Sequence, residues 1–187
     1  MKRIINTSLI VTIFLLIQTS CSEEWLKPDP LSFYAPENVF LNKAGYVSAL
    51  ITLRKDLKYE CYGNRHPFSA EWAYSDLACA TVQADFRKNT PSGSAFFPLL
   101  RYFENVYEFI KNANVVVSRI DDIEWDSDED RNSILAEAYW FRAYWYYRLV
   151  HTYGDVPWIG KELKGAKLDF YTHTRGAILN KIQADLE

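Results

Sequence analysis

Carboxylates are the groups best suited to chemistry in this chain, and most of them gather in one region. Asp121 and Asp122 are followed by the run Asp-Ser-Asp-Glu-Asp at residues 126–130. A glycoside hydrolase needs two carboxyl groups that face each other across a cleft. Here the carboxylates precede a long helical pattern, where Ser and Asp cap the first turn and negative charge complements the helix dipole. The run therefore predicts the start of a helix and not a catalytic pair.

Other catalytic and metal-binding motifs are missing from the sequence. It contains no G-x-S-x-G, no Walker loop, no Rossmann glycine pattern and no H-E-x-x-H. His66, His151 and His173 are far apart, and none stands near a cysteine at zinc-ligand spacing. We therefore expect no catalytic residues, no metal and no cofactor.

Arg142 stands in an apolar environment. At about 100° per residue it shares one side of a helix with Ile134, Ala138, Trp145, Leu149 and Tyr153. A guanidinium buried there costs several kcal/mol unless it is paired. We expect a structural ion pair with a carboxylate within about 4 Å, and contact with a ligand is the alternative.

The element that carries Arg142 is predicted over residues 133–159. Trp140, Tyr144, Tyr147 and His151 lie on its other side, so it is apolar all round and should be buried between neighbouring helices. Packing in the core is the expected role of those three aromatic rings. Gly154 suits the left-handed position after the helix, and Pro157 prevents the helix from resuming.

Helical periodicity predicts four further helices, near residues 36–59, 70–80, 95–120 and from about 174. The stripe of the first is Phe40, Ala44, Val47, Leu50 or Ile51, and Leu57. The stripe of the third is Leu99, Phe103, Val106, Phe109 or Ile110, Ala113 and Val117. Arg175, Ile178, Ile182 and Leu186 belong to the last. Residues 88–93 and 160–170 are expected to connect these helices without regular structure.

Composition sets the class of protein. The 187 residues are 49% hydrophobic and 16% aromatic, which is enough for one domain with a real core. Seven Gly and seven Pro are few for a β-sandwich rich in turns. The net charge is −3, and no basic cluster lies beyond the first three residues, so nucleic acid is not an expected partner.

The first 20 residues resemble a bacterial lipoprotein signal peptide. Lys2 and Arg3 precede the apolar residues 9–17, a run too short to span a bilayer, and small residues lead to Cys21. Cys21 is then the lipidated first residue of the mature chain, although Gln18 departs from the usual pattern. The alternative is an ordinary secretory signal followed by a chance cysteine.

Residues 21–35 are predicted to form a polar tether and an entry segment. Ser22, Glu23 and Glu24 resemble the surface-export signal of Bacteroidota lipoproteins, and a solvated charged tether is the alternative. Cys61 and Cys79 could pair in an oxidising compartment, but two separate buried thiols are favoured because no pattern places them at bonding distance.

Three segments resemble the SusD/RagB family of outer-membrane lipoproteins. AEAYWFRAYWYYRLVHTYGDVPWI at 136–159 is similar to the family's R-A-Y-x-Y-x-x-L-V-x-x-Y-G-D-V-P pattern. YEFIKNANVVVSRID at 107–121 is similar to Y-x-x-I-x-x-A-N-x-V-I, and RGAILNKIQADLE at 175–187 to the helix that follows the turn. The resemblance implies an all-α fold of TPR-like antiparallel helix pairs over residues 36–187.

The function that the resemblance implies is glycan binding at the cell outer membrane. Such a lipoprotein delivers oligosaccharides or other nutrients to a SusC-like TonB-dependent transporter, and it is not an enzyme. Loop residues are the better candidates for sugar contact, here Trp72, Phe86, Arg87 and Asn89. The alternatives are a helical scaffold lipoprotein of an envelope complex and, less favoured, a surface glycoside hydrolase.

The resemblance covers only the front part of the family. We therefore expect a fragment or a truncated gene, with a helical domain that is incomplete at its C-terminus. Part of the stripe of Ile178, Ile182 and Leu186, and part of the Trp140, Tyr144 and Tyr147 side, should then lack cover.

Overall fold

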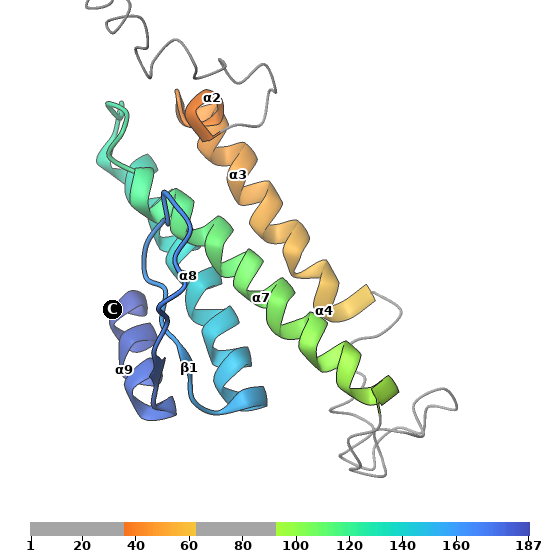
Figure 1. Ribbon diagram of the computed structural model, residues 1–187. Coiled ribbons are helices and arrows are strands. Elements are labelled where there is room, and N and C mark those ends of the chain that lie inside the picture. The colour runs from red at the N-terminus through yellow and green to blue at the C-terminus, as the bar shows by residue number, and fades with distance from the viewer. Residues whose placement is uncertain (1–35, 63–92) are drawn as a thin grey trace, which may run out of the picture. The chain divides into compact units, whose positions relative to one another are not determined.

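The computed structural model describes residues 36–62 and 93–187 (Figure 1). The helices are α2 (Pro36–Val39), α3 (Lys43–Asp56), α4 (Lys58–Tyr62), α7 (Gly93–Arg119), α8 (Asp128–Tyr153) and α9 (Arg175–Leu186). Two short strands, β1 (Val156–Pro157) and β2 (Thr172–His173), lie between α8 and α9. The all-α fold class is confirmed. The helix predicted near 70–80 and residues 88–92 of the predicted loop lie outside the described residues, while Gly93 is the first residue of α7.

The central helix α8 begins and ends as the sequence predicts. The Ser127 side chain accepts a hydrogen bond from the Asp130 backbone N–H at 3.2 Å, and three acidic residues occupy the first turn. Gly154 ends the helix with a φ of +77°, and its N–H donates to the Val150 carbonyl. A positive φ favours glycine because it has no Cβ.

Helices pack around α8 in antiparallel pairs. α8 contacts α7 on one side and α9 on another, while α3 packs against both α7 and α8 (Figure 1). Tyr46 near the start of α3 donates to the Arg119 carbonyl at the end of α7, and Asp56 accepts from Asn112 further back. Those contacts make α3 and α7 antiparallel, as the family resemblance implied.

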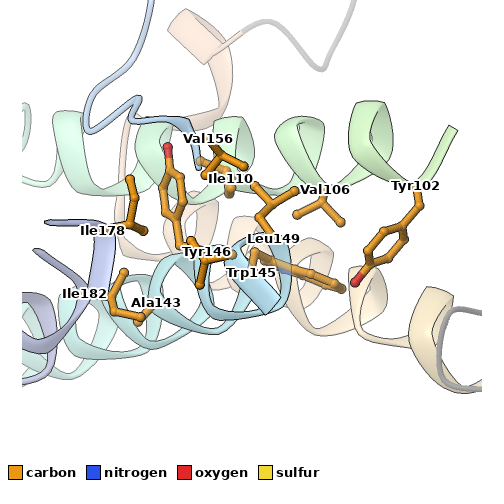
Figure 2. Packing of buried hydrophobic residues seen from close by; sticks show 11 residues of the cluster. Tyr102, Val106, Ile110, Ala143, Trp145, Tyr146, Leu149, Val156, Ile178 and Ile182 are labelled. Atoms are coloured by element: carbon orange, nitrogen blue, oxygen red, sulfur yellow. The ribbon is translucent and has the colours of Figure 1, made fainter. Parts of the chain in front are cut away.

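The core consists of two adjoining clusters along these helices. One joins α7, α8 and α9 through side chains such as Val106, Ile110, Leu149 and Ile178 (Figure 2). The other joins α3, α7 and α8, with members such as Leu50, Leu53, Val116, Ile134 and Phe141. Trp145 and Leu149 are both 0% exposed, which confirms their predicted burial.

The first predicted helix is in fact broken. Asn42 caps α3 by accepting a hydrogen bond from the Gly45 N–H at 3.1 Å, so the chain restarts its helix after Val39. A Cβ at Gly45 would lie 1.7 Å from the Val39 carbonyl oxygen, so only glycine fits where the two helices approach. The prediction of a single helix over 36–59 was wrong, because the spacing of apolar side chains carries no information about such a close backbone contact.

The buried face of α3 also differs from the predicted stripe. Phe40 and Leu50 are buried as predicted, together with Tyr46 and Leu53, which the stripe omitted. Two other predicted members on α3, Ala44 and Val47, are exposed, and so is Ile51, which was the alternative to Leu50. On a helix with apolar residues on several sides, the partner helix decides which side is covered.

The connection between α8 and α9 contains a strand pair that the sequence did not predict. Val156 pairs with His173 and Pro157 with Thr172, antiparallel. Two-residue strands are too short to carry an alternating pattern. The predicted connection at 160–170 is confirmed as lacking regular structure.

Burial of α8 on all sides is not observed. Trp140 and Tyr147 are each 46% exposed and Tyr144 is half-buried, so the core role predicted for Trp140 and Tyr147 is wrong. The prediction that part of this side lacks cover is confirmed. On α9, Ile178 and Ile182 are buried and Leu186 is 58% exposed. Within the described residues, no helix has the length and apolarity to cross a membrane.

Replacing Trp145 by Ala should lower the free energy of unfolding by roughly 3–5 kcal/mol, because the ring is fully buried against Phe109. Trp140→Ala is the matched control. That ring is half exposed on the same helix, so its loss should cost clearly less. Urea unfolding followed by circular dichroism measures both. Equal losses of unfolding free energy in the two variants would contradict the burial of Trp145 and the exposure of Trp140.

Candidate functional site

Arg142 on α8 is the centre of a buried polar cluster. Its side chain is only 6% exposed, and its Nε and one terminal nitrogen donate to the two carboxylate oxygens of Asp185 on α9, the Nε bond at 2.7 Å. The other terminal nitrogen donates to Asn114 Oδ1 on α7 at 3.1 Å and to the Gly160 carbonyl at 2.9 Å. The predicted ion pair is confirmed. It also joins two helices and a loop to α8, which the sequence did not reveal.

Aromatic rings flank the Arg142 guanidinium. The Cζ of Arg142 lies 4.9 Å from the Tyr139 ring centroid and 5.5 Å from that of Trp158. Lys181 Nζ on α9 lies 5.4 Å from the Trp158 centroid. Cations over ring faces gain electrostatic energy, more so when desolvated. The two rings thereby add a second restraint on the guanidinium plane.

Side chains from α7 and α8 bind the backbone of the turn that follows α8. Asn114 donates to the Ile159 carbonyl at 2.7 Å. The Tyr146 hydroxyl donates to the same carbonyl at 3.1 Å and accepts from the Ile159 N–H at 2.6 Å. Tyr107 donates to the Pro157 carbonyl at 2.7 Å. Polar backbone groups of an irregular segment need such partners when they are buried. We call residues 154–160, together with the side chains of Tyr107, Asn114, Arg142 and Tyr146 that hold them, the turn clamp.

The tyrosines of the turn clamp remain neutral at physiological pH. Burial raises the pKa of Tyr146 well above its ordinary value, and the Ile159 hydrogen bond and the Arg142 charge only partly oppose this. Burial, reinforced by Tyr146, also raises the pKa of Tyr107. Both hydroxyls therefore keep the protons that they donate to the turn.

The turn clamp extends to the start of α9. The Asp155 carboxylate accepts from the Arg175 N–H at 2.9 Å, and Thr174 caps α9 by accepting from the Ala177 N–H at 3.3 Å. The predicted helix start near residue 174 is confirmed. The Gly-Asp pair of the turn thus has a structural explanation: Gly154 ends α8, and the Asp155 carboxylate accepts a hydrogen bond from the first N–H of α9.

A second buried polar cluster lies nearer the C-terminal end of α8. Glu60 on α4 is 1% exposed, and its Oε1 accepts from the Tyr102 hydroxyl at 2.5 Å and from Arg148 Nε at 3.1 Å. Burial, together with the Glu60 charge, raises the pKa of Tyr102. This cluster was not predicted from the sequence. Its only signal was a second arginine, Arg148, on an aromatic helix.

The acidic run has the structural role that was predicted for it. Asp128, Glu129 and Asp130 occupy the first turn of α8. Asp130 pairs with Lys43 at 2.6 Å, and Asp121 pairs with Arg131 at 2.7 Å. Within residues 36–62 and 93–187, no group of three or more His, Cys, Asp or Glu side chains is placed to hold a metal ion.

The remaining predicted site residues lie outside the described part of the chain. They are the lipidation residue Cys21, the export residues Ser22, Glu23 and Glu24, and the sugar candidates Trp72, Phe86, Arg87 and Asn89. Cys79 also lies outside it, and the side chain of Cys61 is not described. Their roles and the state of the two thiols stay predictions.

The fold and the turn clamp define a class of all-α protein. Its helices pack in antiparallel pairs, and buried arginines hold neighbouring helices together. A family described as "Starch-binding associating with outer membrane" matches residues 73–187, and the chain belongs to this SusD-like family. The match includes α8, the turn clamp and α9.

Two curated relatives come from Formosa agariphila. SusD-like protein P25 is 24% identical over 201 aligned positions, which span 96% of this chain and 36% of that protein. SusD-like protein P2 is 28% identical over 188 positions, which span 94% of this chain and 35% of that protein. The chain therefore spans just over a third of the length of these relatives. No solved structure matches it.

Arg142→Met should lower the free energy of unfolding by roughly 3–5 kcal/mol, because it leaves the Asp185 carboxylate buried without its partner. Arg131→Met, which breaks a pair with the exposed Asp121, should cost at most about 1 kcal/mol. Urea unfolding measures both. The double variant Arg142→Met with Asp185→Asn completes the test. If its loss of unfolding free energy equals the sum of the two single-variant losses, the two residues are not coupled and the predicted ion pair is contradicted.

Proposed function

We propose that this protein is a cell-surface, lipid-anchored glycan-binding protein. It delivers oligosaccharides or other nutrients to a SusC-like TonB-dependent transporter in the outer membrane. The observation that carries the proposal is the match of residues 73–187 to a family described as starch-binding and outer-membrane-associated.

The described site supports binding rather than catalysis. Its buried charges, Arg142, Asp185 and Glu60, are used in helix-to-helix contacts. In the acidic run, Asp128, Glu129 and Asp130 occupy the first turn of α8, and Asp130 also pairs with Lys43, so these carboxylates have structural roles. In this proposal the helical body is a rigid support, and loop aromatics contact the sugar.

A glycan that the protein binds should lose affinity when Trp72 is replaced by Ala. A central stacking contact between a sugar and an aromatic ring contributes about 2 kcal/mol to the binding free energy, so its loss should raise Kd roughly 30-fold. Arg87→Ala and Asn89→Ala should weaken binding by removing hydrogen bonds to hydroxyls. Isothermal titration with maltoheptaose, followed by a panel of other soluble glycans, measures the affinities.

Tyr171→Ala is the control, because that ring is 78% exposed in the connection before α9. It should bind like the unmodified protein. If no glycan of the panel binds, the glycan-binding proposal fails and the scaffold alternative gains. If binding persists unchanged in all three loop variants, only the choice of site residues is wrong.

Cys21→Ala should abolish labelling with a radioactive fatty acid and release the protein from the membrane fraction. Replacing Glu23 and Glu24 by Ala should leave lipidation intact but reduce cleavage by protease added to whole cells. Retention of label and membrane association in Cys21→Ala would disprove the anchor. Unchanged cleavage in the double variant would disprove the export signal.

A further inference from the structure

The loop between β1 and β2, residues 161–171, exposes large apolar side chains. Leu168 is 96% exposed and Tyr171 is 78% exposed, while Phe170 and Leu163 are 40 and 39% exposed. Leu168, Phe170 and Tyr171 fall within four residues, so the chain itself keeps their Cα atoms within about 11 Å of one another. Exposed apolar side chains that lie together mark an interaction surface.

The base of the β1–β2 loop is fixed to α7. The Glu162 carboxylate accepts two hydrogen bonds from the Arg119 guanidinium, both at 2.8 Å, and the Glu162 N–H donates to the Ser118 hydroxyl at 2.9 Å. The antiparallel pairing of β1 with β2 brings the two ends of the loop together (Figure 1). The loop therefore presents its apolar side chains from a held base.

Lysines are interleaved with these apolar side chains at positions 161, 164 and 167. Lys167 pairs with Asp169 at 3.7 Å, and its Nζ lies 5.7 Å from the Phe170 ring centroid. The other carboxylate of the loop, Glu162, is bound by Arg119. Both carboxylates of the loop are thus engaged, and Lys161 and Lys164 give it an excess of positive charge.

The same two lysines line a hollow of about 530 Å³ between the β1–β2 loop and the end of α7. Ser118 and Arg119 line it from the helix, and Asp122 is the opposing carboxylate there. A lysine ammonium binds phosphate as a compact point charge with three donors. The hollow therefore offers cations to an anionic group next to the exposed apolar side chains.

Apolar side chains, a tyrosine and lysines in one short segment suit the surface of a lipid bilayer. Leucine and aromatic side chains enter the boundary between headgroups and acyl chains, and lysines reach anionic headgroups. We propose that the β1–β2 loop docks on an anionic lipid surface, with Leu168, Phe170 and Tyr171 inserted and Lys161 and Lys164 on headgroup phosphates. The inference rests on the proposed lipid anchor, which holds the chain at the membrane.

A lipid surface fits the β1–β2 loop better than a protein partner does. The apolar side chains of the loop present roughly a few hundred Å², whereas a standard protein interface buries about 800 Å² on each partner. A lipid-anchored chain needs only a weak second contact to stay on a membrane. The net charge of the whole chain is −3, so attraction to an anionic surface should be confined to this loop.

The probes are vesicles of phosphatidylcholine with phosphatidylglycerol in equal parts, and vesicles of phosphatidylcholine alone. The full chain, produced in cells with its anchor, is reconstituted into each, and hydroxyl-radical oxidation is read by mass spectrometry. Each lysine near an anionic surface shifts the docking equilibrium about fivefold. Oxidation of Leu168 and Tyr171 should therefore fall at least about threefold in the anionic vesicles relative to phosphatidylcholine. Tyr147 on α8, at 46% exposed, should react equally in both.

Charge-removing variants test the role of the two lysines. Lys161→Gln combined with Lys164→Gln should return the oxidation of Tyr171 in anionic vesicles to its level in phosphatidylcholine. Lys55→Gln combined with Lys111→Gln is the matched control, because it removes the same charge from exposed positions on α3 and α7. The control should keep the protection of Tyr171. All four lysines are exposed, so neither double variant should unfold the chain.

Tyr171 oxidation that is equal in the two kinds of vesicle, or that the Lys161 and Lys164 changes leave unaltered, overturns the proposal. Protection in detergent that rises with the concentration of the chain overturns it in favour of a second copy. Protection that requires a SusC-like transporter in the vesicles overturns it in favour of a protein partner.

The anchor is read separately from the β1–β2 loop. Fatty-acid labelling of Cys21 and flotation with phosphatidylcholine vesicles report the anchor. Loss of both disproves the proposed anchor and removes the basis of this inference. Label and flotation that persist while Tyr171 stays reactive in anionic vesicles disprove the docking of the loop and leave the proposed function standing.

Discussion

Burial of the Arg142 guanidinium is the constraint on which the packing of α7, α8 and α9 depends. A guanidinium carries five N–H donors in a fixed plane and cannot lose its charge. In the core it therefore needs acceptors from several directions. Asp185, Asn114 and the Gly160 carbonyl supply them, each from a different element. Moving any one of these elements away would leave a buried charge partly unpaired, so the cluster specifies a single arrangement.

A second arginine extends this restraint to the other side of α8. Arg148 follows Arg142 by six residues, about 240° around the helix, so it points to different neighbours. It meets Glu60, which also accepts from Tyr102, and so links α4 and α7 to α8. Together, the two arginines fix α8 relative to helices on both sides. Apolar packing supplies most of the stability, and these directional contacts decide the register.

This rigidity gives the proposed function a physical basis. A loop that binds sugar loses less entropy when its support is fixed. The turn clamp fixes the chain after α8 through hydrogen bonds to its backbone groups, in addition to apolar packing of Val156. In the proposed function, the binding chemistry is left to the loops.

The sequence by itself determined the approximate extent of α7, α8 and α9, the capped ends of α8 and the need to pair Arg142. These follow from local rules: periodicity, a capping Ser127, a Gly154 with positive φ, and the cost of a buried charge. The family also followed from the pattern on α8 and its turn. The sugar candidates, from Trp72 to Asn89, rest on that resemblance alone, since they lie outside the described residues.

Only the tertiary structure decided which side of each helix is covered. α8 is apolar on every side, so its sequence could not show that Trp145 would be buried and Trp140 half exposed. Likewise, the partner of Arg142 is 43 residues away, and Glu60 is 88 residues from Arg148. Such pairings depend on how helices meet in space, which no local pattern contains. The break between α2 and α3 has the same origin, because it brings the Val39 carbonyl against Gly45, a backbone contact that side-chain periodicity does not contain.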